Sequence, residues 1–430
     1  MKIQEQSALR EVLGTVNLPK MLTVRQRFKR DGISDVSSCL RGKLMREDLM
    51  RRIQPGMKVV LTGSSRQVSN MPVVLRELAA FVRGCGATPW IIPAMGSHGG
   101  ATAEGQMAIL EGYGITEAAC GCRIFSSMET VRVGQLDNGD EVCVDRFAHD
   151  ADAVIVVGRI KPHTAFRGPY ESGLVKMMAI GMGKREGADS LHRSGFGAMG
   201  ERLPKYARVV FDHCNVIFGV GLIENEFDET CRIKVLPAED IFAKEPELLE
   251  YARGRMPRIL LPETDVLVVR EIGKNFSGSG MDPNVTGTFG TPYASGGIKK
   301  QRVVVLDISQ ESHGSFIGLG KADVTTLRAF EKLATNATYL NMLTSTVLEV
   351  GKIPMVLEDD RLAIQAAIKT LTGVDRARVR VVYIKNTLSL ASVMISEALM
   401  DEARATEGME VLGDPQPLRF DGIGNLLDLA

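Results

Sequence analysis

The sequence has no excess charge of either sign. Its 430 residues contain 52 lysines and arginines and 52 aspartates and glutamates. A nucleic acid or an acidic membrane surface attracts proteins with a basic excess, because both present closely spaced negative charges. The balanced composition therefore argues against nucleic acid as a partner.

Long apolar runs are also missing. No segment approaches the roughly 18 apolar residues that a membrane helix needs, and the opening MKIQEQS lacks the apolar stretch of a signal peptide. The seven cysteines are scattered, and the close pair Cys120 and Cys122 has the spacing of neither a zinc site nor a redox motif. We therefore expect no membrane partner, ordinary reduced thiols and a cytoplasmic protein.

The sequence does contain enough apolar residues, 44%, for more than one core. Its length exceeds what one core usually organises, and strand and helix patterns alternate, so two α/β domains are expected. In the first half the patterns predict strands at 57–62, 89–94 and 152–157, helices at 72–84 and 103–110, and a hairpin at 130–146.

The alternation begins again near Thr264. The patterns predict strands at 265–269, 302–308 and 378–384 and helices at 324–333 and 360–371. Prolines and a charge shift at 257–263 mark a boundary. We expect an N-terminal catalytic and cofactor-binding domain at 1–260, a C-terminal α/β domain at 261–410 and a tail at 411–430.

Several familiar motifs are not present in full. The glycines of residues 181–187 follow a helical pattern and not a strand, so they make a poor dinucleotide loop. Residues 318–321 lack the first glycine and the final serine or threonine of a P-loop. Ser97 lacks the GxSxG surroundings of a hydrolase nucleophile. The residues of a catalytic or binding site must therefore lie outside these motifs.

Three polar residues follow three predicted strands. His98 comes after the strand at 89–94, His163 after the strand at 152–157, and Arg66, which suits a carboxylate, after the strand at 57–62. Ligands of open α/β sheets bind outside the carboxyl ends of the strands. Each residue alone is better explained by backbone bonding in a loop, but three at successive strand ends indicate a site.

Lys176 lies in the apolar run LVKMMAI at residues 174–180. A buried ammonium is unfavourable, so such a lysine lowers its pKa, pairs with a counter-ion or extends its amine to water. The last is the ordinary interpretation, and a desolvated amine that forms a covalent bond is the functional one. His192, sixteen positions later (192 minus 176), is a candidate metal ligand that needs further donors from a cofactor.

Together these residues resemble the nickel-dependent lactate racemase family. The resemblance rests on Arg66, the segment Gly96-Ser97-His98, the GRIKPH segment that ends at His163, and the spacing from Lys176 to His192. It implies two α/β domains with the active site in the cleft between them, and a tail at 411–430 that returns to the N-terminal domain. It implies an isomerase, a racemase or epimerase that inverts C2 of a 2-hydroxy carboxylate.

The resemblance also implies a cofactor, the nickel-pincer nucleotide. This is a pyridinium-3,5-bisthiocarboxylic acid mononucleotide that is bonded to a lysine and holds nickel through two sulfurs and a ring carbon. Lys176 would be the anchor, His192 the nickel ligand, His98 and His163 the acid/base pair, and Arg66 a substrate-binding group. Cofactor-synthesis proteins would then be partners in maturation.

The cofactor phosphate is expected at backbone amides of a helix start. One candidate is the stretch with Gly99 and Thr102, and the other is the stretch with Lys184. The sequence does not choose between them.

The inversion of a 2-hydroxy carboxylate explains why such a cofactor and two histidines would be needed. The α-hydrogen of a 2-hydroxy carboxylate is a very poor acid, because its removal places a carbanion beside a negative charge. Hydride transfer turns the alcohol into a ketone instead, provided that a base removes the hydroxyl proton and a cofactor stores the hydride. Return of the hydride to the other face inverts the centre. Two histidines suit the two stereoisomers, whose hydroxyls lie on different sides.

The sequence departs from the lactate enzymes in two places. Gly63 stands where the family has an acidic residue, and residues 272–287 replace a proline-lysine-aspartate segment and a tyrosine-glutamine pair. Lys274 and Thr286 are candidate substrate-binding residues of this segment. The small Thr286 and Gly287 predict a roomier pocket and a substrate bulkier than lactate, such as a sugar acid. A flexible loop explains the same glycines equally well.

Two other functions remain open from the sequence. A Schiff-base enzyme of the aldolase type would use Lys176, but it would give His192 no functional role. A non-enzymatic sugar-acid-binding homologue would keep the fold, although the complete set of histidines and lysine argues against decay. The substrate, the preferred stereoisomer and whether the chain forms a homo-oligomer are not set by the sequence.

Overall fold

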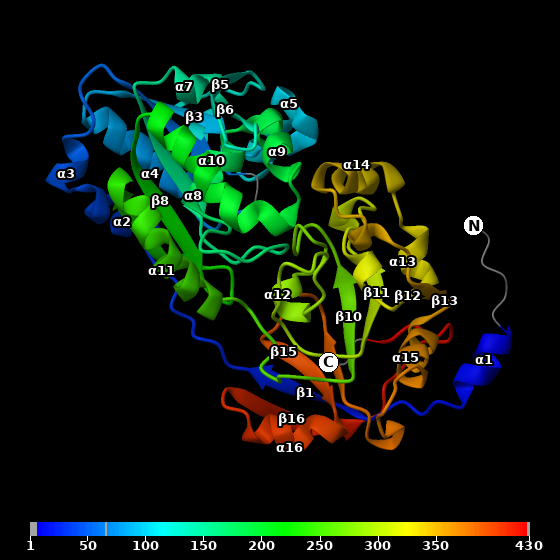
Figure 1. Ribbon diagram of the computed structural model, residues 1–430. Helices are drawn as coiled ribbons and strands as arrows, with labels where there is room; N and C mark the ends of the chain where they lie inside the picture. Colours follow the sequence, from blue (N-terminus) through cyan, green and yellow to red (C-terminus); the bar gives the residue numbers. More distant parts are fainter. Residues whose placement is uncertain (1–6, 65–66, 428–430) are drawn as a thin grey trace. The chain divides into compact units, whose positions relative to one another are not determined.

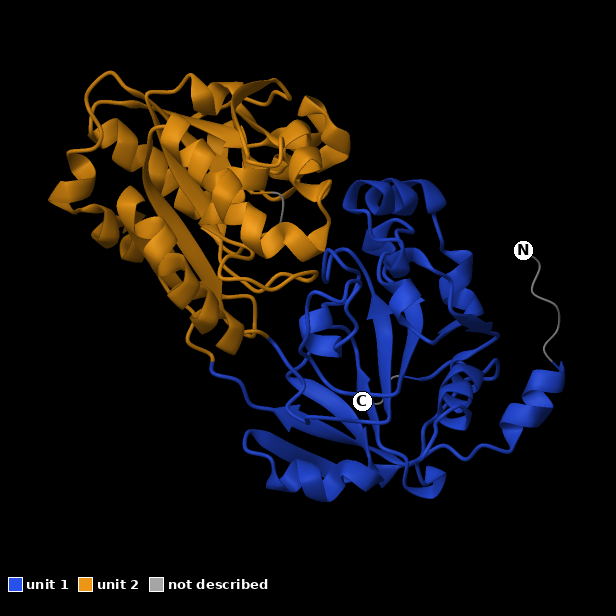
Figure 2. Cartoon of the chain, in the orientation of Figure 1, with its two compact units in different colours: residues 1–29, 257–430 blue, residues 30–256 orange. Residues whose placement is uncertain are grey.

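The computed structural model describes residues 7–64 and 67–427 and has the expected α/β architecture (Figure 1). The chain forms two compact units, which are coloured separately in Figure 2. Unit 2 is Arg30–Met256, and unit 1 is Met1–Lys29 with Pro257–Ala430. This division differs from the expected 1–260, 261–410 and 411–430, because the N-terminal segment folds with the C-terminal half.

Unit 2 is built on a sheet with the strand order β4-β3-β2-β7-β8-β9. All neighbours are parallel except β8 and β9. The strands are β2 (Lys58–Gly63), β3 (Thr88–Pro93), β4 (Arg123–Ile124), β7 (Ala153–Arg159), β8 (Val216–Glu224) and β9 (Thr230–Pro237). The central strands are almost wholly buried, which explains why they are continuous apolar runs in the sequence.

The expected hairpin is present beside this sheet as β5 (Thr130–Gln135) and β6 (Glu141–Asp145). The helices of unit 2 are α2 (Val36–Leu44), α3 (Glu47–Met50), α4 (Met71–Gly84), α5 (Ala103–Gly112), α6 (Glu117–Cys120), α7 (Arg146–His149), α8 (Leu174–Lys176), α9 (Lys184–His192), α10 (Met199–His213) and α11 (Ile241–Gly254). In the main core, Leu75 and Leu78 of α4 pack with Val59, Ile91 and Ile155 of the strands. The two helices predicted at 72–84 and 103–110 therefore correspond to α4 and α5.

Unit 1 contains the sheet β13-β12-β11-β10-β14-β15-β1-β16, parallel from β13 to β14 and antiparallel from there on. Its strands are β1 (Met21–Gln26), β10 (Val266–Ile272), β11 (Arg302–Ile308), β12 (Val324–Thr326), β13 (Met355–Leu357), β14 (Val381–Ile384), β15 (Ser392–Ser396) and β16 (Met409–Gln416). Alternate residues of β10 enter two different cores. Leu267 and Val269 belong to one core, and Val266 and Val268 belong to the other. Both faces of the sheet are therefore covered.

The helices of unit 1 are α1 (Ser7–Gly14), α12 (Pro283–Thr286), α13 (Leu327–Glu331), α14 (Thr335–Ser345), α15 (Asp360–Lys369) and α16 (Met400–Ala405). The helix predicted at 324–333 is wrong at its start. Val324, Thr325 and Thr326 form β12 instead, because β-branched side chains favour the extended conformation and pair here with β11 and β13. Within residues 7–64 and 67–427, no helix is long and apolar enough to cross a membrane.

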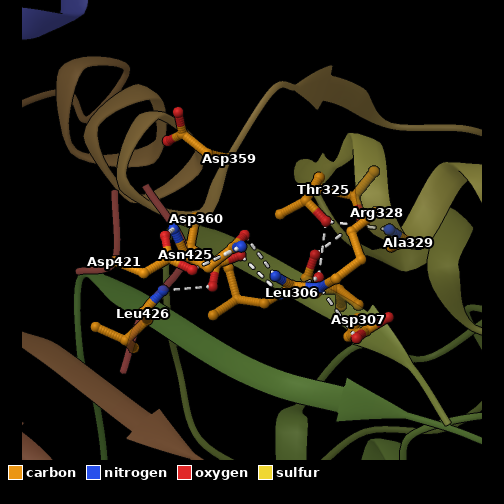
Figure 3. A network of polar contacts seen from close by, with 12 residues as sticks. Leu306, Asp307, Thr325, Arg328, Ala329, Asp359, Asp360, Asp421, Asn425 and Leu426 are labelled. Carbon is orange, nitrogen blue, oxygen red and sulfur yellow. Dashed lines mark hydrogen bonds and ion pairs between the residues drawn. The ribbon is translucent and has the colours of Figure 1, made fainter. Parts of the chain in front are cut away.

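A polar network holds the tail inside unit 1 (Figure 3). The Arg328 guanidinium contacts Asp307 at 3.0 Å, Asp360 at 2.9 Å and the side-chain oxygen of Asn425 at 2.6 Å. Asp360 also accepts the N–H of Leu426 at 2.8 Å. The described contacts of the tail are with this network and, through β16, with β1, which belongs to unit 1 but lies within the expected N-terminal range 1–260.

The chain crosses from one unit to the other twice. Within each unit, polar contacts join the two crossing segments to one another. On the unit 2 side, the Arg255 guanidinium binds the two carboxylate oxygens of Asp31 at 2.7 and 3.0 Å and also pairs with Glu226. On the unit 1 side, the buried Gln26 amide donates to Arg258 and accepts the N–H of Leu260. In each unit the incoming and outgoing segments are thus tied to one another.

We expect Arg328→Met to destabilise unit 1 by about 2 kcal/mol, because it leaves the buried Asp360 carboxylate without its cation. The value is at the low end for a buried pair because Arg328 is partly exposed. Urea unfolding measures it. The matched control is Lys352→Met, which removes an exposed pair with Glu349 and should change stability by less than about 0.5 kcal/mol. Equal effects of the two variants would contradict the role given to the network.

Candidate active site

Three loops leave the same edge of the unit 2 sheet. β3, β2 and β7 are adjacent and parallel, so their carboxyl ends lie side by side. The loop after β3 carries His98, and the loop after β7 carries His163. Arg66, expected after β2, lies outside the described residues. The strand order therefore brings the loops of the two histidines to one edge, where ligands of such sheets bind.

Lys176 and His192 lie in a helical segment that is interrupted at Lys184, whose φ is +52°. It consists of α8, the π-helical turn η2 (Met177–Gly181) and α9. Leu174, Val175 and Met178 of this segment are fully buried, whereas Lys176 and His192 are only partly buried. A π-helical turn shifts the side chains that follow it, and such turns are frequent at functional sites.

The surroundings of His192 favour a neutral imidazole. Burial lowers its pKa, and the positive charge of Lys176 lowers it further, although the bond to Ala188 opposes both. Nδ1 donates to the Ala188 carbonyl at 2.7 Å, which leaves the lone pair on Nε2. This is the tautomer in which a histidine binds a metal ion. Among the described residues no group of three or more His, Cys, Asp and Glu side chains could hold a metal.

Phe196 links His192 to His163. Its ring centroid lies 5.6 Å from the His192 ring and 6.1 Å from the His163 ring. The His163 ring also lies 4.5 Å from the Phe166 ring, and both phenylalanines are buried. The two imidazoles therefore border a common aromatic wall.

The backbone of the His163 loop is fixed by charged side chains. The His163 N–H donates to the fully buried Glu171 at 2.6 Å, and Arg167 donates to the His163 carbonyl at 2.6 Å. The Ala165 N–H donates to Nδ1 of the His163 ring at 3.1 Å. Because Nδ1 accepts this bond, a neutral His163 carries its proton on Nε2.

The His98 loop packs against the segment that carries Lys176. The N–H of Gly96 donates to the carbonyl of Gly181 at 3.2 Å. A Cβ atom on Gly96, whose φ is +58°, would lie 3.2 Å from Ile180, so the close approach favours glycine. The buried Gln106 amide donates to the carbonyls of Gly96 and His98 at 2.8 and 3.3 Å. The position of His98 thus depends on α5 and on η2.

The side chain of Lys184 has a structural role. It is fully buried, and its Nζ contacts the Pro93 carbonyl at 2.6 Å, Asp145 at 2.9 Å and the Gln106 side-chain oxygen at 3.2 Å. Burial lowers the pKa of Lys184 and raises that of Asp145, while the attraction between the two charges opposes both shifts. Two hydrogen bonds and an ion pair thus hold the Lys184 ammonium within unit 2, and a phosphate at the backbone amides of this stretch stays a prediction.

Gly99 and Thr102 also have local roles. The Thr102 hydroxyl accepts the N–H of Gly105 at 3.0 Å and so caps α5. A Cβ atom on Gly99 would lie 2.5 Å from the backbone of Gly105, so glycine permits the contact between the loop and α5. Both residues are explained by this packing, without a phosphate.

Lys274 and Thr286 belong to unit 1. The Lys274 N–H donates to Ser312 at 2.8 Å. Thr286 is fully buried, and its hydroxyl contacts Thr288 at 2.6 Å. A Cβ atom on Gly287 would lie 2.5 Å from the Ile298 carbonyl. Packing therefore explains the small residues at both positions, and the roomier pocket stays a prediction.

Sequence reasoning missed the residues that support the site. These are Gln106, Asp145, Glu171 and Phe196, all buried. The one local signal was the i, i+4 spacing of Arg167 and Glu171, which form an ion pair. Phe196 lies four positions after its contact His192, whereas Gln106 and Asp145 contact the distant Lys184, so no local pattern identifies these two.

Residues 14–202 match the family model of the lactate racemase N-terminal domain. This segment is similar to that domain. The matched segment includes His98, His163, Lys176 and His192, together with the undescribed Arg66. No curated protein is similar enough to this chain to count as a match.

Two solved structures share the fold over most of the chain. The lactate racemase apoprotein from Thermoanaerobacterium thermosaccharolyticum is 12% identical and has a TM-score of 0.51, with 86% of this chain and 99% of that one covered. A protein from Thermotoga maritima is 14% identical, also with a TM-score of 0.51, with 85% and 99% covered. This chain and the two solved structures thus share a fold over most of their length.

We expect Lys184→Met to destabilise unit 2 by about 3–5 kcal/mol, because the Asp145 carboxylate would stay buried without its cation. Adding Asp145→Asn should recover part of the loss, since the amide oxygen still accepts the Ala148 N–H that Asp145 now accepts. Urea unfolding of the single and double variants measures the coupling. Strictly additive effects would mean that the two groups do not act as a pair.

Proposed function

We propose that the chain is a nickel-dependent racemase or epimerase that inverts C2 of a 2-hydroxy carboxylate. The match to the lactate racemase N-terminal domain supports an isomerase of this family. The observation that carries the proposal is the segment from Lys176 to His192, which sets an amine near an imidazole whose Nε2 lone pair is left for a metal ion. The ring of Phe196 joins this pair to His163.

These residues fit a nickel-pincer nucleotide. Lys176 would hold it covalently and His192 would bind the nickel, in the neutral form that burial favours. When bound, the cofactor would supply an acceptor and donor of hydride beside the substrate carbon. The aromatic rings of Phe166 and Phe196 would limit the access of water to that side of the site.

His98 and His163 would handle the proton of the substrate hydroxyl, but their environments differ. His163 in its neutral form offers an N–H at Nε2, because the Ala165 N–H occupies Nδ1. It therefore suits a hydrogen bond to the substrate oxygen, and proton uptake at Nε2 requires the Ala165 contact to open. His98 has its carbonyl held by Gln106, and it is the proposed proton acceptor for the other stereoisomer.

The proposed substrate class is the 2-hydroxy carboxylates. A sugar acid was expected from the small Thr286 and Gly287, and the packing of these residues does not support that argument. Lactate and aldonates are therefore to be tested side by side, with Arg66 and Lys274 as the proposed carboxylate-binding groups.

Intact mass and nickel content test the proposal, with protein produced together with cofactor-synthesis proteins. We expect the wild type to carry the mass of the nucleotide and one nickel, Lys176→Ala to carry neither, and His192→Ala to keep the nucleotide but bind nickel about 10–100-fold more weakly. An unmodified Lys176 in the wild type would refute the proposal. Trapping of a carbonyl substrate on Lys176 by borohydride would favour a Schiff-base enzyme instead.

Two further variants test the histidines. We expect His98→Ala and His163→Ala each to lower kcat by about 10²–10⁴-fold, the usual contribution of a positioned acid or base, and to retain nickel. Racemisation is followed by the change in optical rotation. His213→Ala is the control, because His213 is exposed at the end of α10. Loss of nickel from either variant would show that the roles are misassigned.

A further inference from the structure

Glu245 contacts the turn that carries Lys176. Its side chain comes from α11 and is fully buried. The carboxylate accepts the N–H of Val175 at 3.0 Å, and the N–H of Leu174 beside it also acts to lower the pKa of Glu245. These are the first two N–H groups of α8, which have no partner inside the helix. Glu245 therefore caps α8 from a helix that follows it by 70 residues (245 minus 175).

The N-cap residue Gly173 explains why the capping group of α8 comes from another helix. It is the N-cap residue of α8, and as glycine it has no side chain that could accept these bonds. A Cβ atom on Gly173 would collide with Oε1 of Glu245. Glu245 thus fills the space of an ordinary capping side chain, and Gly173 leaves that space open for it.

The Glu245 carboxylate is kept in an unfavourable environment. Oε1 has no hydrogen-bond partner among the described residues, and burial raises the pKa of Glu245 to about 7. An apolar residue of similar size would avoid this desolvation. General stability therefore does not explain a glutamate here, which points to the cap as its role.

Two further contacts connect α11 to the same stretch of chain. The Tyr170 hydroxyl donates to the Phe242 carbonyl at 2.7 Å, and Arg253 pairs with Glu171 at 3.2 Å. With Glu245 on Val175, α11 contacts residues 170–175 at three places. This stretch leads from the His163 loop to Lys176, so α11 fixes the backbone between two proposed site residues.

We propose that Glu245 is a positioning residue for Lys176, whose buried carboxylate replaces the missing cap at Gly173 and fixes the turn from which the Lys176 amine extends. The consequence for cofactor attachment rests on the proposed function, whereas the cap itself does not. A residue that served only to fill the core would be replaced without loss by an apolar side chain.

Two substitutions separate these roles. Glu245→Leu fills the space without an acceptor, and Glu245→Gln keeps one acceptor oxygen. Glu247→Leu is the matched control, because Glu247 is exposed on the same helix. For each variant, the thermal midpoint is measured, together with hydrogen exchange of the peptide that contains Leu174 and Val175 and the fraction of protein that carries the nucleotide after production with cofactor-synthesis proteins.

We expect Glu245→Leu to keep the thermal midpoint at or above that of the wild type, while exchange at Leu174 and Val175 rises about fivefold or more and nucleotide loading falls. Glu245→Gln should restore protection and loading, and Glu247→Leu should change neither. Unchanged exchange in Glu245→Leu would overturn the proposal, and so would a Glu245→Gln variant as defective as Glu245→Leu. A wild type that never carries the nucleotide would refute the proposed function, while the exchange measurements would still decide whether Glu245 is a cap.

Discussion

The arrangement of unit 2 around its candidate site depends on one buried ammonium group. Lys184 begins α9, and its Nζ reaches the last carbonyl of β3, the Asp145 carboxylate at the end of β6 and the Gln106 side chain of α5. A charge without contact to water needs every one of these partners, so their relative positions are fixed. Gln106 extends the network to the carbonyls of Gly96 and His98, and α9 ends at His192.

The network therefore relates two proposed site residues that lie far apart in the sequence. His98 follows β3, and His192 follows Lys184 by two turns of α9. On the other side of the site, Glu171 and Arg167 hold the backbone of His163. The site residues themselves are only partly buried, whereas the supporting residues Gln106, Glu171 and Lys184 are buried. Precision in such a site comes from the supporting side chains.

Much of the fold could be predicted from local pattern. Buried parallel strands are continuous apolar runs, so β2, β3, β7 and β11 were recognisable, and Asn138-Gly139 marked the hairpin. The strand β12 was missed because its three residues precede a helix start, at which Thr326 accepts the N–H of Ala329. The pairing of β1 with β15 and β16 joins the two ends of the chain, and no local pattern contains such information.

The two lysines show where sequence reasoning about the site reached its limit. Lys176 lies among apolar residues, and either an amine that extends to water or a desolvated amine was considered for it, whereas the stretch with Lys184 was one of two candidates for a phosphate site. In the structure Lys176 is partly exposed, while Lys184 is fully buried. The burial of Lys184 depends on Asp145 and Gln106, which come from other elements, so its local sequence could not reveal it.

The placement of Arg30–Met256 inside the sequence of unit 1 has a consequence for biosynthesis. As the ribosome adds residues from the N-terminus, unit 2 has its full sequence once Met256 has emerged, and it can fold while the rest is still being made. β1 is made early but has to wait for β15 and β16, its neighbours in the sheet, which are translated near the end. The Arg255 contact with Asp31 can close the ends of unit 2 during this interval. Unit 2, which contains the proposed cofactor-binding residues, would thus fold before unit 1.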